Sequence, residues 1–379
     1  MKATRVVIAW EMLFHKKRRL IVSLMAVMFA VVIMFMQQGF FNGLNDSQAM
    51  VPPLFNADLV LMDHRREHMN RWNDLPVNRL AQAAALPEVT EVLPVYNGTF
   101  AFKNRLTGQG RRMFVLAFPP DSRALRLPEL AALAPRLREH GTILFDRKSR
   151  SIYGPVEPGA QVEMDERQYT VVGLFEMGPN FSNDGAVLMG EGTWLEAVNA
   201  ATGEMPAWGL VRLRPGTNVA AVQARLRATL PKDTLVLTPE EMRQREVDYT
   251  IRAVPIGAIF GIGLIIGFII GTIICYQILF NEITDHMPQY ATLKAMGYSD
   301  GFLRRVVLQQ ALLLSILGFV PGLLGGFGLY ALLYEWTSIV MFQTLGRASL
   351  IFLLTVLMCV GAGMIAVKKV LRSDPAEVF

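Results

Sequence analysis

Residues 281–309 read NEITDHMPQYATLKAMGYSDGFLRRVVLQ and lie between two long apolar runs. The sequence therefore predicts a short polar connection between two membrane spans. Helix-forming residues run from Tyr290 to Met296 and end at Gly297, a pattern typical of a helix that is stopped by a left-handed residue. A short helix along the membrane surface would give a soluble partner a rigid lever to push.

A second helix is predicted to begin in the same connection. Asp300 can serve as its N-cap, and Arg304 and Arg305 would then lie at the membrane edge. The connection is therefore predicted to be structured rather than slack.

The composition predicts a membrane protein. The chain has 379 residues, of which 52% are hydrophobic and only 18% are charged, and its mean hydropathy is +0.32. The net charge of +5 comes from basic residues beside the apolar runs, which indicates membrane orientation rather than nucleic-acid binding. Cys275 and Cys359 both fall inside apolar runs, so we interpret them as small core residues.

The apolar runs predict four transmembrane helices, at residues 20–41, 253–280, 306–334 and 349–367. The first run is longer than the apolar part of a signal peptide and no A-x-A-like site follows it, so we interpret it as a retained span. Basic residues before it place the N-terminus in the cytoplasm. The segments outside the spans are predicted as a cytoplasmic amphipathic helix (1–19), an extracytoplasmic domain (42–252), a cytoplasmic coupling loop (281–305), an outer loop (335–348) and a cytoplasmic tail (368–379).

The extracytoplasmic domain is predicted to have an α+β fold, because strand and helix patterns alternate along it. Strands are expected at 57–62, 92–96, 113–118, 142–146, 169–175, 186–189 and 210–213, and helices at 76–86, 193–201 and 218–230. The Pro- and Arg-rich stretch 119–140 could begin an inserted subdomain. Residues 239–252 are charged and helical, and are expected to form a stalk that leads into the second span.

Two sets of glycines in the second span have the spacing that lets helix backbones approach closely. One set is Gly257 and Gly261, and the other is Gly263, Gly267 and Gly271. The spacing alone is compatible with packing inside one chain or between two chains.

The connection between spans two and three resembles the coupling segment of FtsX/MacB-type ABC transporter permeases. Ala291 and the run Leu293, Lys294, Ala295, Met296 and Gly297 match that family's E-x-A-x-L-[RK]-A-[LM]-G pattern. The family usually has Glu where Gln289 or Tyr290 stands here. One span, an outer domain of about 200 residues and three further spans also resemble the MacB-type (type VII) layout.

Short segments near both ends are similar to the DevC-like subgroup of that family. They are Ala9-Trp10 with Arg18-Arg19-Leu20, Gln38-Gly39-Phe40 with the run Asn56–Leu61, and the tail Leu371–Phe379. Residues 100–235 carry no matching motif.

The resemblance implies a homodimeric permease in the bacterial inner membrane that works with a separate cytoplasmic ABC ATPase. That ATPase would hold ATP-Mg, and this chain would bind no cofactor. A periplasmic membrane-fusion adaptor and a TolC-like outer-membrane channel would complete an export system. Tyr290, Leu293, Lys294, Ala295, Met296 and Gly297 would dock the ATPase, whose motion the spans would pass to a MacB-like periplasmic core domain (mechanotransmission).

The substrate class is open at this point. The resemblance implies an amphiphile such as a glycolipid or lipopeptide, and haem or a small toxic compound fits the same layout. An alternative function is that of an FtsX-like regulator, which activates a cell-wall hydrolase or relays a signal.

Catalytic motifs are missing from the sequence. It has no G-x-x-x-x-G-K-[ST] phosphate loop, no G-x-S-x-G and no H-E-x-x-H, so we expect a transporter subunit and not an enzyme. His64 and His68 are four residues apart, as two metal ligands on a helix turn would be. Because two arginines lie between them and no third ligand is near, we interpret this stretch as a solvated loop or helix.

Overall fold

The computed structural model describes residues 17–372, except 72, 181, 199–204, 254, 289–298 and 338–340. The predicted surface helix before residue 17 and the tail after residue 372 therefore lie outside the described residues. The chain divides into two compact units. One unit comprises residues 1–43 and 256–379, and the other comprises residues 44–255.

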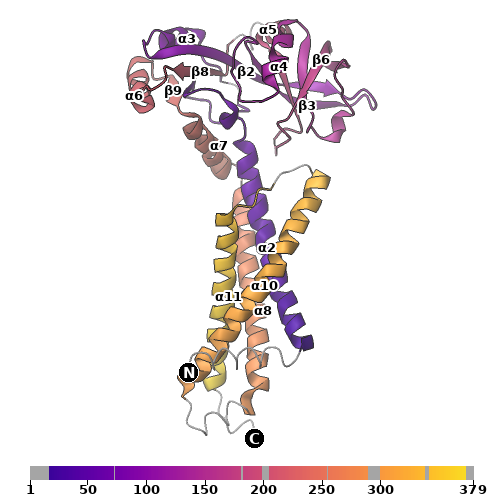
Figure 1. Ribbon diagram of the computed structural model, residues 1–379, viewed down its shortest axis with the longest axis vertical. Coiled ribbons are helices and arrows are strands. Elements are labelled where there is room, and N and C mark those ends of the chain that lie inside the picture. The colour runs from indigo at the N-terminus through magenta and orange to yellow at the C-terminus, as the bar shows by residue number, and fades with distance from the viewer. Residues whose placement is uncertain are drawn as a thin grey trace. The chain divides into compact units, whose positions relative to one another are not determined.

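The first unit is built on four long apolar helices (Figure 1). They are α2 (Lys17–Gln48), α8 (Ile256–Asp285), α10 (Asp300–Thr337) and α11 (Leu345–Arg372). Each is long and apolar enough to cross a bilayer, which confirms the predicted four-helix membrane class. The helices extend past the predicted apolar runs at seven of their eight ends. A helix can continue into the polar and charged residues that flank an apolar run.

The exception is the start of α8, where residue 253 was predicted to open the second span. Ala253 instead ends α7 (Pro239–Ala253), the helix that precedes α8. Pro255 lies between the two helices and has no backbone N–H to donate, so the helical hydrogen bonding is interrupted there.

A common apolar core joins the four helices. It includes Phe35 from α2, Leu279 from α8, Leu314 from α10 and Met358 from α11. Cys275 and Cys359 are buried free thiols in this core, with their sulfur atoms 3.7 Å apart, as expected for small packing residues.

The second unit contains nine strands. They are β1 (Leu59–Asp63), β2 (Val89–Lys103), β3 (Gly110–Phe118), β4 (Thr142–Asp146), β5 (Gln161–Met164), β6 (Arg167–Phe175), β7 (Ala186–Gly190), β8 (Trp208–Leu213) and β9 (Thr234–Leu237). Its helices are α3 (Val77–Ala84), α4 (Leu130–Leu133), α5 (Glu191–Ala197), α6 (Val219–Thr229) and α7, with short 3-10 turns η1 (Pro52–Leu54), η2 (Ala134–Arg138) and η3 (Ser151–Tyr153). The mixture confirms the predicted α+β class.

Six of these strands pair in a closed ring. The order β2-β3-β7-β4-β6-β5 returns to β2 through the pairing of β5 with β2. The ring encloses a core in which Phe102, Phe145 and Trp194 are buried. Trp194, on α5, fits against the strand only because residue 98 is glycine: a Cβ there would lie 2.6 Å from the indole.

The first half of β2 belongs to a second sheet, in the order β2-β8-β1-β9. Helices α3 and α6 cover one face of this sheet, where Leu59 and Leu61 of β1 meet Val222 and Leu226. Val60 and Met62 point to the other face and pack with Met242 of α7. Because both faces are covered, every residue of β1 is buried.

The predicted elements of this unit are mostly present, with three corrections. Strands β5 and β9 are missing from the prediction, and β2 is fifteen residues long where residues 92–96 were expected. The stretch 119–140 does not begin a subdomain, because the six-stranded ring already starts within β2, at Tyr96. Leu125, Leu130 and Leu137 of that stretch instead fill the core beside the second sheet.

The expected stalk is α7, and its start is fixed by a capping box. The Glu241 N–H donates to Thr238 Oγ1 over 3.1 Å, and the Thr238 N–H donates to Glu241 Oε2 over 2.8 Å. Pro239 follows the cap at the first helical position, where its missing N–H has no cost.

Candidate functional site

The predicted ATPase-coupling residues lie outside the described residues. They are Tyr290, Leu293, Lys294, Ala295, Met296 and Gly297. The structure describes what precedes them: His286 Nε2 lies 3.3 Å from Glu282 Oε1, and both side chains are nearly buried at the end of α8. The docking role of the loop stays a prediction.

The predicted glycines of α8 lie in two different surroundings. Gly263, Gly267 and Gly271 face α2, where an added Cβ would meet Gln37, Ile33 and Ala30 at 2.5–3.0 Å. Gly257 is in ordinary contact with Phe41, and nothing lies within 4 Å of a Cβ at Gly261. The three-glycine set therefore packs within the chain, against α2 and, at Gly271, also against Met358 of α11.

A second glycine row, on α10, was not included among the predicted site residues. Gly318, Gly322 and Gly326 lie against α2 one turn apart, and a Cβ at Gly322 would be 2.6 Å from Val31 Cγ1. The Tyr330 hydroxyl continues this row and donates to the Phe35 carbonyl. The four-residue spacing was the available signal, but Gly325 and Gly328 beside it obscured the row.

Helix α2 thus lies between two glycine rows, one on α8 and one on α10. Close approach of backbones is how membrane helices gain packing energy without a hydrophobic driving force. Most of these contacts are apolar and non-directional, and the exceptions are Gln37 against Gly263 and the Tyr330 hydroxyl bond to Phe35. The helices are therefore held together mainly by side-chain shape.

The second unit (residues 44–255), called the outer unit below, holds α7 differently, through the segment 63–74, DHRREHMNRWND, which we call the charged loop. It follows β1 and precedes α3. Asp63 begins it with a turn in which its Oδ1 accepts the Arg65 N–H over 2.8 Å. The described residues of this loop contact α7, β2, β8 and the start of β9.

Glu246 of α7 is the main point of attachment. Its side chain is 1% exposed, and its Oε2 accepts the Met69 N–H over 3.1 Å. Burial raises the pKa of Glu246 to about 7, against the lowering by the Met69 hydrogen bond and by the charges of Arg66 and Arg245. The stalk helix is therefore fastened by a buried carboxyl group that is near its ionisation midpoint at neutral pH.

His68 lies directly against this carboxyl group. Its Nδ1 accepts the Asn70 N–H over 3.1 Å, so the ring proton is on Nε2, which lies 3.4 Å from Glu246 Oε2. Burial, together with the nearby charges of Arg71 and Arg66, lowers the pKa of His68 to about 4. The contact at neutral pH is therefore with a neutral imidazole and is not an ion pair. The His68 ring also packs against the Tyr249 ring of α7, with the centroids 5.1 Å apart and the planes tilted by 34°.

Arg66 links the charged loop to strands of both sheets. Its guanidinium is 2% exposed, donates to Asn97 Oδ1 of β2 over 2.8 and 3.2 Å, and lies 4.8 Å above the Trp208 ring of β8. Asn97 in turn donates to the Met69 carbonyl over 2.7 Å. Burial lowers the pKa of Arg66 to about 10, although Asp74, Glu246 and Asp63 oppose this.

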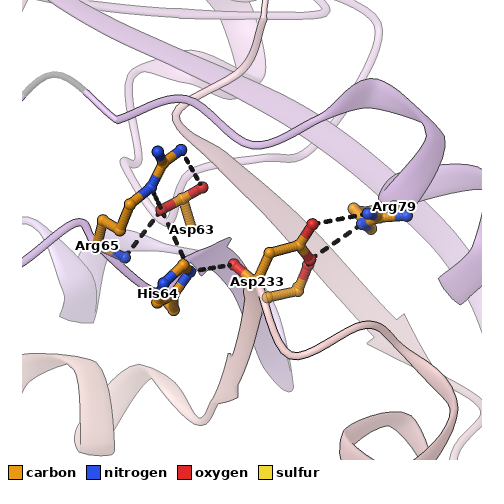
Figure 2. Close-up of polar contacts among 6 residues, drawn as sticks. Asp63, His64, Arg65, Arg79 and Asp233 are labelled. Atoms are coloured by element: carbon orange, nitrogen blue, oxygen red, sulfur yellow. Dashed lines mark hydrogen bonds and ion pairs between the residues drawn. The ribbon is translucent and has the colours of Figure 1, made fainter.

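The start of the charged loop is held by the polar contacts drawn in Figure 2. Arg65 pairs with Asp63 through both side-chain oxygens, and the His64 ring bonds the Asp233 carbonyl over 3.2 Å. Asp233 also forms a two-bond pair with Arg79 of α3, over 2.7 and 3.2 Å. These contacts tie β1, β9 and α3 together beneath the loop.

The two histidines of the loop do not converge on a metal position. His64 turns to Asp233 and His68 turns to Glu246. The expectation of a loop or helix rather than a metal pair agrees with this geometry, but His68 is 8% exposed and not solvated. Among the residues that the structure describes, no group of three metal-ligating side chains occurs.

Two family models match the sequence. Residues 20–229 match the MacB-like periplasmic core domain, and residues 261–375 match the FtsX-like permease C-terminal model. The first match alone spans more than half of the chain. No curated protein matches the sequence.

Solved structures give weaker likenesses. The periplasmic region of MacB from Actinobacillus actinomycetemcomitans is 10% identical, with a TM-score of 0.37, over 51% of this chain and 94% of that one. The extracellular domain of the ABC-type transporter YknZ from Gram-positive bacteria is 10% identical, with a TM-score of 0.33, over 48% of this chain and 99% of that one. Likenesses at this level carry no argument about function.

Proposed function

Because this chain belongs to the FtsX/MacB family of ABC transporter permeases, we propose that it converts ATP hydrolysis by a separate cytoplasmic ATPase into motion of its outer unit. The chain is the membrane subunit of such a system, and the ATPase binds and hydrolyses ATP-Mg. The DevC-like subgroup is part of the proposal, supported by the short segments near both ends of the sequence.

The proposed orientation places both termini and residues 289–298 in the cytoplasm and the second unit in the periplasm. Basic side chains support this: Lys17 and Arg18 precede the first apolar run, and Arg304 and Arg305 precede the third. All four are exposed at the ends of their helices, where the positive-inside rule expects them.

The proposed path of motion starts at the loop that contains Lys294 and Gly297. When the ATPase closes, it pushes this loop, and α8 and α10 move with it. Two residues, 254 and 255, separate the end of α7 from the start of α8, so we expect a displacement of α8 to be transmitted to α7.

The observation that carries this proposal is the attachment of α7 through buried Glu246. A stalk that only rested on the outer unit would bend or slide when pulled. A carboxyl group that is bonded to the Met69 backbone, and continues through Asn97 and Arg66 into two sheets, makes α7 and the outer unit move as one body.

An export system further needs a periplasmic membrane-fusion adaptor, a TolC-like outer-membrane channel and a second copy of this chain to match two ATPase subunits. We include these partners in the proposal, together with an amphiphilic substrate. Their support is the family resemblance.

Co-purification of the full chain with candidate cytoplasmic ABC ATPases tests the proposal. We expect the wild type to capture an ATPase and Lys294→Glu and Gly297→Val to lose it, because one reverses the docking charge and the other puts a β-branched residue at a helix stop. Lys232→Glu, a charge reversal at an exposed site in the outer unit, is the matched control and should capture normally. Capture of no ATPase, or equal capture by all variants, contradicts the docking role.

A further inference from the structure

A groove in the outer unit follows the stalk helix, and we call it the α7 groove. Its volume is about 580 Å³, and six of the seven described residues that line it belong to α7, with Glu67 of the charged loop as the seventh. Along α7 the lining residues Glu241, Arg245, Asp248 and Arg252 follow at steps of four, three and four, so they share one face of the helix. The volume is within the range of about 300–1,000 Å³ that is usual for small-ligand pockets.

Two of the three carboxyl groups in the α7 groove are already engaged by neighbouring groups. Glu241 Oε2 accepts the Thr238 N–H over 2.8 Å and also accepts the side-chain amide of Gln223. Asp248 Oδ1 accepts the Gln244 amide over 3.0 Å. Part of the hydrogen-bonding capacity of these two carboxylates is therefore used inside the chain.

The other three charged groups of the groove are uncommitted. Arg252 and Glu67 are exposed, and within the part of the chain that the structure describes neither forms a hydrogen bond or an ion pair. The Arg245 Nε atom is buried and also lacks a hydrogen-bond partner among those residues. A buried N–H group without an acceptor costs free energy, so a ligand that accepts from Arg245 gains by binding.

The uncommitted charges are of both signs, and this decides the class of ligand. Guanidinium groups match phosphate oxygens through charge-assisted hydrogen bonds, and a carboxylate matches an ammonium group. A simple anion would be repelled by Glu67, and a simple cation would leave Arg245 and Arg252 unmatched. A small group that carries both a phosphate and an amine satisfies all three side chains.

The chain itself keeps the α7 groove close to the membrane. Arg252 is four residues before Ile256, the first residue of α8, so chain length alone holds the two within about 14 Å of each other. The polar headgroup layer of a bilayer is about 5–8 Å thick on each side. Lipid headgroups are therefore within reach of the groove.

We propose that the α7 groove binds a zwitterionic phosphate–amine headgroup, with the phosphate at Arg245 and Arg252 and the ammonium group at Glu67. The ligand is a phospholipid of the bilayer or an exported amphiphile with the same headgroup. The inference deepens the proposed function by naming the headgroup of its amphiphilic substrate, and it rests on that function only for the second of these sources.

Ligand titration of the full chain in a maltoside detergent and a phosphate-free buffer tests the site. The probe is dihexanoyl phosphatidylethanolamine, and the readout is the heat of binding. We expect saturable binding, and at least about ten-fold weaker binding of dihexanoyl phosphatidylglycerol, which has the phosphate without the amine, and of inorganic phosphate. Equal affinities for the two lipids, or no saturable binding, would overturn the proposal.

Two variants of exposed residues test the assignment of the charges. Arg252→Gln should weaken binding of phosphatidylethanolamine about ten-fold, and Glu67→Gln should abolish the preference for phosphatidylethanolamine over phosphatidylglycerol. A loss of structure would weaken both lipids alike and would not produce this split. Arg214→Gln and Glu157→Gln change exposed residues outside the groove and are the matched controls. Groove variants that bind like these controls would overturn the assignment.

The source of the ligand is read from vesicles of phosphatidylglycerol that contain a minor share of chain-labelled phosphatidylethanolamine, with the partner ATPase present. Release of the bound label on addition of ATP identifies an exported amphiphile, and retention identifies a bilayer lipid; both support the site. The titration itself needs no ATPase, so it separates this inference from the proposed function. Capture of an ATPase by a chain that does not bind the probe overturns the site alone, and selective binding without capture overturns the function alone.

Discussion

The membrane unit and the α7 attachment hold their helices by opposite means. In the membrane unit, α2 packs between glycine rows of α8 and α10, and the contacts are mostly backbone against apolar side chain, with Gln37 against Gly263 as the polar exception. In the outer unit, α7 is held by a buried carboxyl group, a neutral histidine and a buried guanidinium that bond to named atoms. The packing of α2 is therefore sensitive to the size of the side chains at the glycine positions. The attachment of α7 is sensitive to the protonation of its buried carboxyl and imidazole groups.

The difference fits the work proposed for each region. Small-residue contacts between helices allow a bundle to readjust without breaking hydrogen bonds, which suits the part that must change shape. Directional bonds between buried groups are costly to break, which suits the part that must move as one body. Variants that add volume should therefore damage the bundle, and variants that alter charge should damage the attachment.

The largest effect is expected from volume added to the α10 glycine row. In Gly322→Ile the new Cβ would meet Val31 at 2.6 Å, so α2 must separate from α10, at a cost of more than about 3 kcal/mol. Gly328→Ile on the same helix is the control, since nothing lies within 4 Å of a Cβ there. Thermal unfolding of the full chain in detergent measures both, and equal midpoints would contradict the close packing of α2.

The next largest effect is a pH dependence of stability. In the wild type two opposite contributions largely cancel. The pKa of Glu246 is raised from 4.5 to about 7, so the folded state binds the extra proton and stability falls as pH rises across that window. The pKa of His68 is lowered from 6.5 to about 4, so the unfolded state binds the extra proton and stability rises with pH from 4 to 6.5. Each contribution is about 3 kcal/mol, and they oppose each other between pH 4.5 and 6.5.

Single variants should reveal the two slopes. Glu246→Gln leaves the histidine contribution, so its stability should rise with pH in this window, and His68→Gln should show the reverse. Denaturant unfolding of the outer unit within the full chain, at several pH values, measures the slopes. Two variants with parallel slopes would refute the assignment.

The smallest effect is expected at the start of α7, where the contact is local. Thr238→Ala removes the acceptor for the Glu241 N–H and should cost about 1 kcal/mol. Thr238→Ser keeps a hydroxyl and should behave as the wild type in the same unfolding measurement. A loss in Thr238→Ser as large as in Thr238→Ala would show that the hydroxyl is not what matters.

The parts of the fold that the sequence predicts are those with local causes. Four apolar runs specify four helices by length alone, and β4, an apolar five-residue strand, has the predicted ends. β2 continues beyond the predicted 92–96 although Asn97-Gly98 has the pattern of a hairpin turn. In the structure Asn97 bonds Arg66 and Gly98 makes room for Trp194, so both residues are used by tertiary contacts inside a continuing strand.

The attachment of α7 had no local signal. His68 and Glu246 are 178 residues apart, and nothing near either residue indicates that it is buried beside the other. The pattern D-H-R-R-E-H is typical of a solvated segment, and only the fold shows that Arg66 and His68 lie inside. Short strands such as β5, with alternating polar residues, were missed for the same reason: their pairing partners define them.

The central claim is that α7 and the outer unit move as one body when the partner ATPase binds ATP. The most direct measurement is the distance between spin labels at Gln244 of α7 and Arg214 at the end of β8, both exposed in the outer unit. We expect one narrow distance that ATP does not change in the wild type, and a broad, ATP-dependent distribution in Glu246→Ala. An ATP-dependent change in the wild type as large as in that variant would contradict the claim.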